Sequence, residues 1–280
     1  MTPRLPSRRD PGPVRGLLQT DAPDGVIEHE RVGASDAVAS VLTHHWWVRW
    51  ELRSPHLAQT LPHPTVHVTI SRSEADGLRA ELSGVPTRAF RRTLAGRGWV
   101  FGLKFRPASF VALWPHPLHQ LTDRVVPLRE LFGGEADALM HAIDGTDSLA
   151  TRVELAERWL AGRRPQLPAQ AAALRDLVEH MQHDHGMRRA EDAAAHAGVE
   201  LRTLQRQFRR YVGVSPKWVA RRYRLHEVAQ RLTESSPPSL AELAAELGYA
   251  DQAHFSRYFS EVVGCAPGPY AARARAAAGR

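Results

Sequence analysis

The sequence predicts an α+β fold, in which a β-rich barrel domain precedes an all-α domain with two helix-turn-helix units joined by a long helix. Short runs of β-favouring residues, broken by glycine and proline, fill the chain from about 15 to 132. After Gly133 and Gly134 the sequence changes to alanine- and leucine-rich helical patterns. One pattern of a turn followed by a helix then occurs twice in the C-terminal third of the chain.

The bulk composition is that of a globular protein with room for two domains. The chain has 280 residues, of which 43% are hydrophobic and 24% are charged. Its net charge of +7 favours an acidic partner. The single cysteine, Cys265, excludes an intramolecular disulfide and a cysteine-based zinc cluster, and it indicates a reducing compartment.

The first residues, 1–13, are basic and contain several prolines, and we expect a disordered tail there. No apolar core follows them, which argues against a signal peptide. No stretch of the chain approaches the ~20 apolar residues of a membrane span. We therefore expect a cytoplasmic protein without a membrane partner.

We expect the N-terminal domain over 14–164. Strands are expected at 66–71, 78–85 and 99–107, where β-favouring residues alternate or run together. A helix follows in which Ser148 is the cap and Gly162 marks the end. The next segment contains two prolines and lacks a periodic pattern, so we place the boundary near Arg164 and the second domain at 165–280.

The repeated pattern is typical of helix-turn-helix units. Each copy has a short alanine-rich helix, then a glycine suited to a left-handed turn, Gly198 in one copy and Gly248 in the other. A second helix follows, with apolar anchors four residues apart that face inward. These anchors are Leu204, Phe208, Phe255 and Phe259. We expect the two units at about 189–211 and 239–263.

The outward faces of these second helices carry residue types that can contact DNA bases. They are Arg202, Gln205, Arg206 and Arg209 in the first copy, and Gln252, Ala253, His254, Ser256 and Arg257 in the second. Arginine can bond guanine and glutamine can bond adenine through paired hydrogen bonds. The alternative is an ordinary solvated helix face. DNA is favoured because the motif occurs twice, and because Glu200 to Arg224 holds eight basic residues and one acid.

The helix expected between the two units, 215–235, would act as a rigid spacer. Ser215 is its cap and Pro216 lies in its first turn. Its apolar stripe consists of Trp218, Leu225, Val228 and Leu232. Two reading helices that enter successive major grooves should lie about 34 Å apart.

Residues 170–273 resemble the AraC/XylS family of bacterial transcription regulators, through the segments LQRQFRRYVGVSPKWV and LAELAAELGYADQAHFSRYFSEVVGCAPGPY. The resemblance implies base contacts by Arg202, Gln205, Arg206, Gln252, Ala253, His254, Ser256 and Arg257. It implies phosphate contacts by Arg209, Arg210, Lys217 and Arg221. We expect double-stranded DNA as the partner, RNA polymerase as another if the protein is an activator, a homodimer, and no cofactor. The arginine-rich first unit is expected to be the stronger anchor, and the second a weaker reader that tunes the site.

Residues 61–133 resemble an uncharacterised sensor-type domain found on such regulators, which implies a cupin-like barrel but supplies no ligand. Aromatic and histidine side chains could line an apolar effector pocket, and the alternative is barrel core with a dimer face. The candidate pocket residues are Trp46, Trp47, Trp50, His63, His67 and Trp99. An anionic effector could instead be bound by arginines, unless these form a solvated strand face; they are Arg88, Arg91, Arg92 and Arg106.

A metal site is disfavoured in the N-terminal part. His63 and His67 would share a face if both lay on one strand, but the pair of histidines two residues apart that a metal cupin needs is missing. The sequence also lacks a nucleophile elbow and a phosphate-binding glycine loop, so we expect no enzyme activity. Two alternatives stay open: a ligand-independent regulator whose N-terminal part only oligomerises, and a cupin-type metalloenzyme with a regulatory DNA-binding tail.

Overall fold

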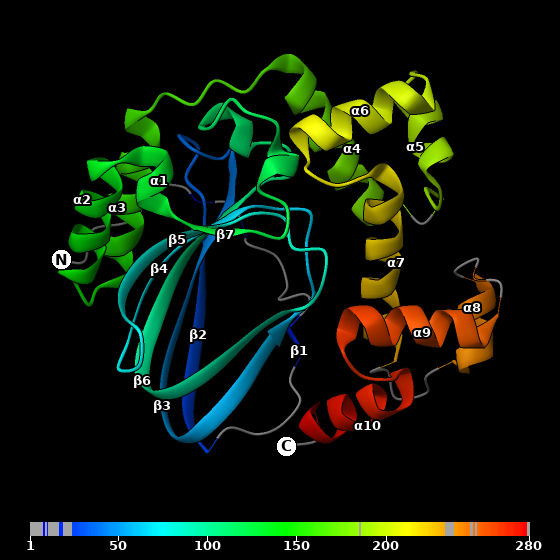
Figure 1. Ribbon diagram of the computed structural model, residues 1–280, viewed down its shortest axis with the longest axis horizontal. Coiled ribbons are helices and arrows are strands. Elements are labelled where there is room, and N and C mark those ends of the chain that lie inside the picture. The colour runs from blue at the N-terminus through cyan, green and yellow to red at the C-terminus, as the bar shows by residue number, and fades with distance from the viewer. Residues whose placement is uncertain are drawn as a thin grey trace.

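The computed structural model describes residues 24–184, 186–232, 238–246 and 251–278, together with 8, 10, 17–18 and 249. Its N-terminal part is a β-rich sheet and its C-terminal part is helical (Figure 1). The strands are β1 (Leu17–Leu18), β2 (Gly25–Gly33), β3 (Leu42–Thr60), β4 (His67–Ser73), β5 (Gly77–Ser83), β6 (Phe90–Phe105) and β7 (Val125–Pro127). The three strands expected from the sequence correspond to β4, β5 and β6, although β6 begins earlier than predicted.

The sheet is antiparallel and open, which corrects the predicted barrel. Its order is β1-β3-β6-β4-β5-β7, with β2 paired to β3 as well. Within the described residues β7 pairs only with β5 at one edge, and β1 and β2 pair only with β3 at the other. Because β7 has just three residues and leads directly into a helix, it gives the sheet a short edge that does not reach the opposite side.

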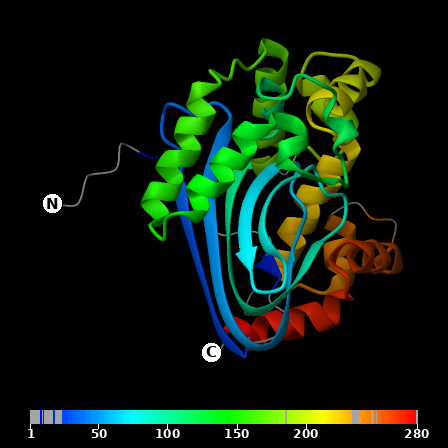
Figure 2. The same ribbon diagram turned by 60° about the vertical axis from the view of Figure 1, so that its left-hand side comes forward.

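Three helices cover one face of the curled sheet (Figure 2). They are α1 (Leu128–Phe132), α2 (Gly134–Asp144) and α3 (Leu149–Gly162). Ser148 caps α3 as expected, since its side chain accepts a hydrogen bond of 3.3 Å from the Thr151 N–H. Alternation along the strands sends Ile70, Phe101 and Leu103 to this covered face, where all three are fully buried.

The chain then runs through an extended segment at 164–168 into the helical part. The predicted boundary near Arg164 falls at the start of this segment, and where the domains divide stays a prediction. The remaining helices are α4 (Ala169–His183), α5 (Ala190–His196), α6 (Leu201–Tyr211), α7 (Pro216–Arg231), α8 (Leu240–Glu246), α9 (Gln252–Val263) and α10 (Pro267–Ala278). We call α5–α6 the first helix pair and α8–α9 the second helix pair. They lie toward opposite ends of α7 (Figure 1).

The two helix pairs belong to different hydrophobic cores. One core runs without interruption from the sheet through α1–α3 into α4, the first helix pair and the start of α7. It contains Phe101 of the sheet together with Leu204 and Phe208 of α6. A separate core joins the rest of α7 to the second helix pair and α10, and Leu61 is the member it takes from the sheet domain among the described residues.

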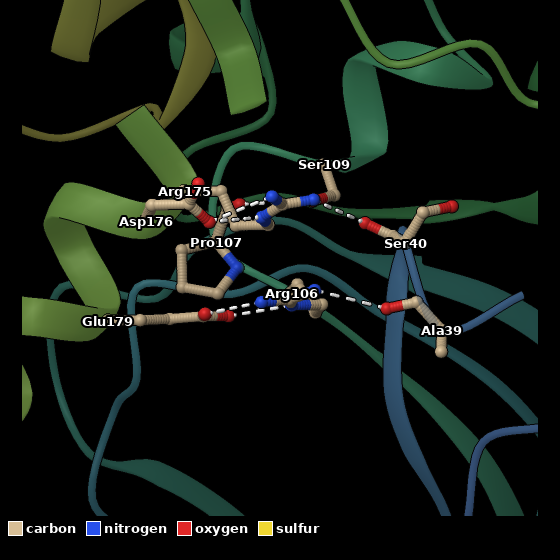
Figure 3. A network of polar contacts seen from close by, with 8 residues as sticks. All are labelled: Ala39, Ser40, Arg106, Pro107, Ser109, Arg175, Asp176 and Glu179. Carbon is tan, nitrogen blue, oxygen red and sulfur yellow. Dashed lines mark hydrogen bonds and ion pairs between the residues drawn. The ribbon is translucent and has the colours of Figure 1, made fainter. Parts of the chain in front are cut away.

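Polar contacts also join α4 to the sheet domain. Arg106, just after β6, forms an ion pair with Glu179 of α4, with 2.7 Å between Nε and Oε1, and donates to the carbonyl of Ala39 (Figure 3). Arg175 of α4 donates to the carbonyl of Ser40 in the same network. The sheet domain and α4 are therefore held together by side chains at several points.

Candidate nucleic-acid interface

The turn of the first helix pair has the predicted glycine geometry. Gly198 adopts a φ of 65°, in the left-handed region that favours glycine. Leu204 and Phe208 of the following helix are completely buried, so the opposite face of α6 points outward. That face is exposed at Arg202, Gln205, Arg206, Arg209 and Arg210. Five side chains expected to contact DNA therefore share one open surface.

The second helix pair presents fewer open positions. Asp251 caps α9 by accepting a hydrogen bond of 2.6 Å from the His254 N–H, and Phe255 and Phe259 are completely buried. Gln252, Ala253 and Arg257 are exposed, whereas His254 and Ser256 are half-buried. The His254 ring meets Tyr249 edge-on with centroids 5.5 Å apart. Gly248, the glycine predicted to form this turn, lies outside the described residues.

The connecting helix α7 begins as expected. The Ser215 hydroxyl accepts a hydrogen bond of 3.1 Å from the Trp218 N–H, and Lys217 in the first turn is exposed. Arg221, predicted to contact a phosphate, is instead engaged within the protein. Its guanidinium lies 5.0 Å from the ring centroid of Tyr258 in α9. This cation–π contact joins α7 to the second helix pair.

Arginine side chains connect the two helix pairs across α7. Arg224 donates to the carbonyl of Arg188, just before the first helix pair, at 2.5 Å. Arg188 in turn donates to the carbonyl of Glu246 at the end of α8, and Arg231 forms an ion pair with the Glu246 carboxylate. These contacts join the two helix pairs through side chains near the surface rather than through a shared core.

The structure does not bring together the six residues predicted for an effector pocket. Trp46, Trp50 and His67 lie on the sheet face that α1–α3 leave uncovered, and the rings of Trp46 and His67 meet edge-on with centroids 6.2 Å apart. Trp47 and Trp99 lie on the covered face. His63 and His67 do not lie on one strand, because His63 is in the loop before β4.

The loop at 61–66 contacts the helical part instead. The His63 ring packs against that of His226 in α7, with centroids 4.4 Å apart. The His226 Nε2 lies 3.2 Å from the carbonyl oxygen of Pro62, and the Nε of Arg222 donates to the same oxygen at 2.5 Å. Burial, together with the positive charge of Lys104, holds the pKa of His63 well below 6.5.

Basic and histidine side chains also gather on the uncovered face of the sheet. Burial first, and then the charges of Lys104 and Arg31, lower the pKa of His44 from 6.5 to about 2. Burial and Lys104 lower that of His67 to about 3. This grouping was not predicted from the sequence, because the residues come from four different strands. Two of the four arginines considered for binding an anionic effector are already paired with carboxylates, Arg106 with Glu179 and Arg92 with Asp76.

Among the described residues, no three His, Cys, Asp or Glu side chains are grouped so that they could hold a metal ion. In the same part of the chain, every helix is too short or too polar to span a membrane.

Comparison with known protein families gives two matches. A family model described as a helix-turn-helix domain matches residues 193–273, and a domain of unknown function, DUF6597, matches residues 30–127. The first match includes most of both helix pairs and all of α7.

The characterised proteins to which this chain is similar are transcription regulators. The chain is 30% identical over 226 residues to the HTH-type transcriptional regulator GlxA of Rhizobium meliloti, covering 72% of this chain and 68% of GlxA. It is 36% identical over 69 residues to the HTH-type transcriptional activator RhaS of Klebsiella pneumoniae, where the match covers 25% of this chain and 24% of RhaS. The chain thus matches about a quarter of the length of the RhaS relatives.

Among solved structures, ToxT from Vibrio cholerae O395 aligns over 82% of this chain and 96% of its own, with 10% identity and a TM-score of 0.37. At that TM-score the likeness adds nothing to the fold described above.

Proposed function

This chain belongs to the AraC/XylS family of DNA-binding transcription regulators, and we propose that it binds double-stranded DNA through two helix-turn-helix units, the first and second helix pairs. The observation that carries this proposal is the outward face of α6. It places five polar or basic side chains on one exposed surface, directly opposite the buried Leu204 and Phe208. The charge of that surface suits the phosphate backbone, which dominates affinity for DNA.

We assign base contacts in the first half-site to Arg202, Gln205 and Arg206, with α6 in a major groove. In the second half-site, α9 offers Gln252, Ala253 and Arg257 from exposed positions, while His254 and Ser256 contribute from half-buried ones. Phosphate contacts are assigned to Arg209, Arg210, Lys217 and Arg221. Arg221 must leave Tyr258 to reach a phosphate, so we expect it to contribute less than Lys217.

The sheet domain has a separate proposed role. We assign to it the response to a small-molecule effector and the formation of a homodimer, with RNA polymerase as a further partner if the protein activates transcription. Its continuous core with the first helix pair supports this role, because a change in the sheet domain acts directly on α6. The relatives found by comparison are regulators, which supports a protein that acts in the cytoplasm without catalysing a reaction.

The proposal is tested by selecting fragments of the source genome with the purified full-length protein. We expect recovered fragments to share a motif with two half-sites, and the affinity for that motif to fall steeply with salt. In a Lys217→Ala variant, binding to all sequences should weaken and the salt slope should decrease by about one. Recovery of fragments without a shared motif would contradict sequence-specific binding. Tightly held stoichiometric metal in the same preparation would instead favour the metalloenzyme.

A further inference from the structure

The most unusual charged group in the molecule is Arg222, in the middle of α7. Its side chain is fully buried, and only its Nε has a described partner, the carbonyl oxygen of Pro62. Both Nη1 and Nη2 are buried without a hydrogen-bond partner. A buried guanidinium carries five N–H donors and a full charge, so leaving two nitrogens unpaired is strongly unfavourable.

The surroundings of Arg222 contain no compensating carboxylate among the described groups that influence it. Burial lowers the pKa of Arg222 to about 9, and the groups that partly offset this are the hydroxyls of Tyr258 and Tyr249. The Tyr249 hydroxyl is itself buried without a hydrogen-bond partner. His226 lies beside the same Pro62 carbonyl as Arg222, with its ring packed against that of His63, and neither histidine carries a negative charge.

These groups come from three separate parts of the chain. Arg222 and His226 lie on α7, His63 lies in the loop that joins β3 to β4, and Tyr249 lies just before α9. Each one offers a hydrogen-bond donor or a positive charge. Of these side chains, Arg222 and Tyr249 bury hydrogen-bond donors without a partner, which natural proteins rarely do unless something accepts those bonds.

We propose that Arg222, together with the Tyr249 hydroxyl, binds an oxyanion, namely a carboxylate or phosphate group carried by a small molecule. A planar guanidinium matches both groups through two parallel hydrogen bonds, and a buried site strengthens them. The anion satisfies the unpaired nitrogens of Arg222 and neutralises the excess of positive charge near His63. Of the two groups, Arg222 supplies the charge and Tyr249 a single donor.

This site deepens the proposed function, on which its regulatory meaning rests, because it identifies the chemical class of the effector. The bound anion would join α7 to the segment that precedes α9, beside a loop of the sheet domain. It would therefore hold the second helix pair in a fixed position relative to α7. Occupancy then changes how well α9 is placed for its half-site, without contact between the effector and DNA.

The test measures the melting temperature of the full-length protein as inorganic phosphate or benzoate is added, with sodium chloride of equal ionic strength as the reference. The two probes separate a phosphate group from a carboxylate. Arg222→Met removes the charge and the donors but keeps an unbranched side chain, and Arg222→Lys keeps only the charge. Arg158→Met, on the exposed face of α3, is the matched control.

We expect at least one probe to raise the melting temperature of the wild type and of Arg158→Met by the same amount. In Arg222→Met the apparent dissociation constant should be at least about tenfold higher, and in Arg222→Lys it should be intermediate. Without a probe, Arg222→Met should melt at or above the wild-type temperature, because an unpaired buried charge has been removed. If Arg222→Met does not fold, the proposal is judged by whether Arg222→Lys binds the probe more weakly than the wild type does.

The proposal is overturned if neither probe stabilises the wild type beyond chloride, or if the Arg222 variants respond as the wild type does. Binding of probe-free protein to the selected genomic fragments is measured in parallel. Sequence-specific binding to DNA without any probe effect would reject the anion site alone. A probe effect that depends on Arg222 in a protein that selects no DNA motif would reject the proposed function and leave the anion site.

Discussion

The two helix pairs share a local design but differ in how they attach to the rest of the molecule. The first packs its anchors Leu204 and Phe208 into the same core as the sheet. It also receives a hydrogen bond of 2.7 Å from Thr122 to the carbonyl of Gly213, which follows α6. The second packs its anchors into its own core, to which the sheet domain contributes Leu61.

In the proposed function, this difference connects the first reading helix, and not the second, to the main core of the sheet domain. We expect a change in the sheet to be transmitted to α6, because the side chains packed between them tolerate little independent movement. The second pair meets the sheet domain at Leu61, through a backbone hydrogen bond of 3.2 Å from the Ala89 N–H to the Val262 carbonyl, and where the Arg91 guanidinium lies against Gly264. We therefore expect α6 to move with the sheet domain and α9 to move with α7.

The largest predicted effect is a contrast between two core substitutions. Phe208→Ala and Phe259→Ala each remove a fully buried ring, and each should lower the free energy of unfolding by about 3–5 kcal/mol. Phe208→Ala should also raise hydrogen exchange in β4 and β6, because they share its core. Phe259→Ala should raise it in α8, α9, α10 and the second half of α7, which share its core, and not in β4 and β6. Unchanged protection of the sheet in Phe208→Ala would contradict the shared core.

Matched arginine substitutions compare the two reading helices. Arg206→Ala should lose about 1–3 kcal/mol of binding free energy on the selected motif and relax its specificity. Arg257→Ala should lose less, because α9 has a less basic surface and two of its candidate residues are half-buried. Titration of both variants against the motif and against random DNA makes the comparison. Equal losses on both DNAs for Arg206→Ala would show that it grips phosphate rather than reading bases.

Acid should weaken the body that contains the sheet and the first helix pair. His44 is neutral when folded, since its pKa falls from 6.5 to about 2, but it is protonated below pH 6.5 when unfolded. The unfolded state therefore binds more protons, and stability present above pH 6.5 is lost as the pH falls. At pH 5.5 the loss from His44 alone should be about 1.4 kcal/mol.

Denaturant titrations at pH 7.5 and 5.5, with hydrogen exchange to locate the change, measure this effect. The second core contains no histidine among its members in the described part of the chain, so its exchange should change less. A His44→Gln variant should show a smaller dependence on pH. If that variant loses as much stability as the wild type, His44 is not the group responsible.

The smallest predicted effect concerns the attachment of α4. Glu179→Gln breaks a partly buried ion pair, in which the side chains of Arg106 and Glu179 are 16% and 32% exposed, and should lower stability by about 1 kcal/mol. Glu74→Gln is the control, because the Glu74–Arg97 pair is open to solvent and its loss should not be measurable. Equal melting temperatures for the two variants would remove this contact from the attachment of the helices.

The local parts of the fold were predictable from the sequence. Anchors four residues apart at Leu204 and Phe208 fix which face of α6 is buried, and a serine before a helix fixes its start at Ser148. The separation of Trp46 from Trp47 was predictable too, because neighbouring residues on a strand point to opposite faces. Grouping them in one pocket overlooked that rule.

Other features depend on contacts between distant parts of the chain. The stacking of His63 on His226 and the entry of Leu61 into the second core have no local pattern to reveal them. Arg222 is an intermediate case. It lies four residues after Trp218 and three before Leu225, on the same stripe of α7, so its burial could have been expected. That it is left with unpaired nitrogens could not.

The separate second core also determines how this protein can be recombined with others. A hybrid joined near Arg164 would cut the sheet away from the helices that complete its packing, and would expose Leu174, Val178 and Phe208 to water. Exchange of α8, α9 and α10 for those of another protein disturbs the sheet domain at Leu61, at the Ala89–Val262 hydrogen bond and where Arg91 lies against Gly264, but not in its main core. The half-site that we propose for α9 is thus the one that engineering, or gene fusion over evolutionary time, can replace without rebuilding the sheet domain.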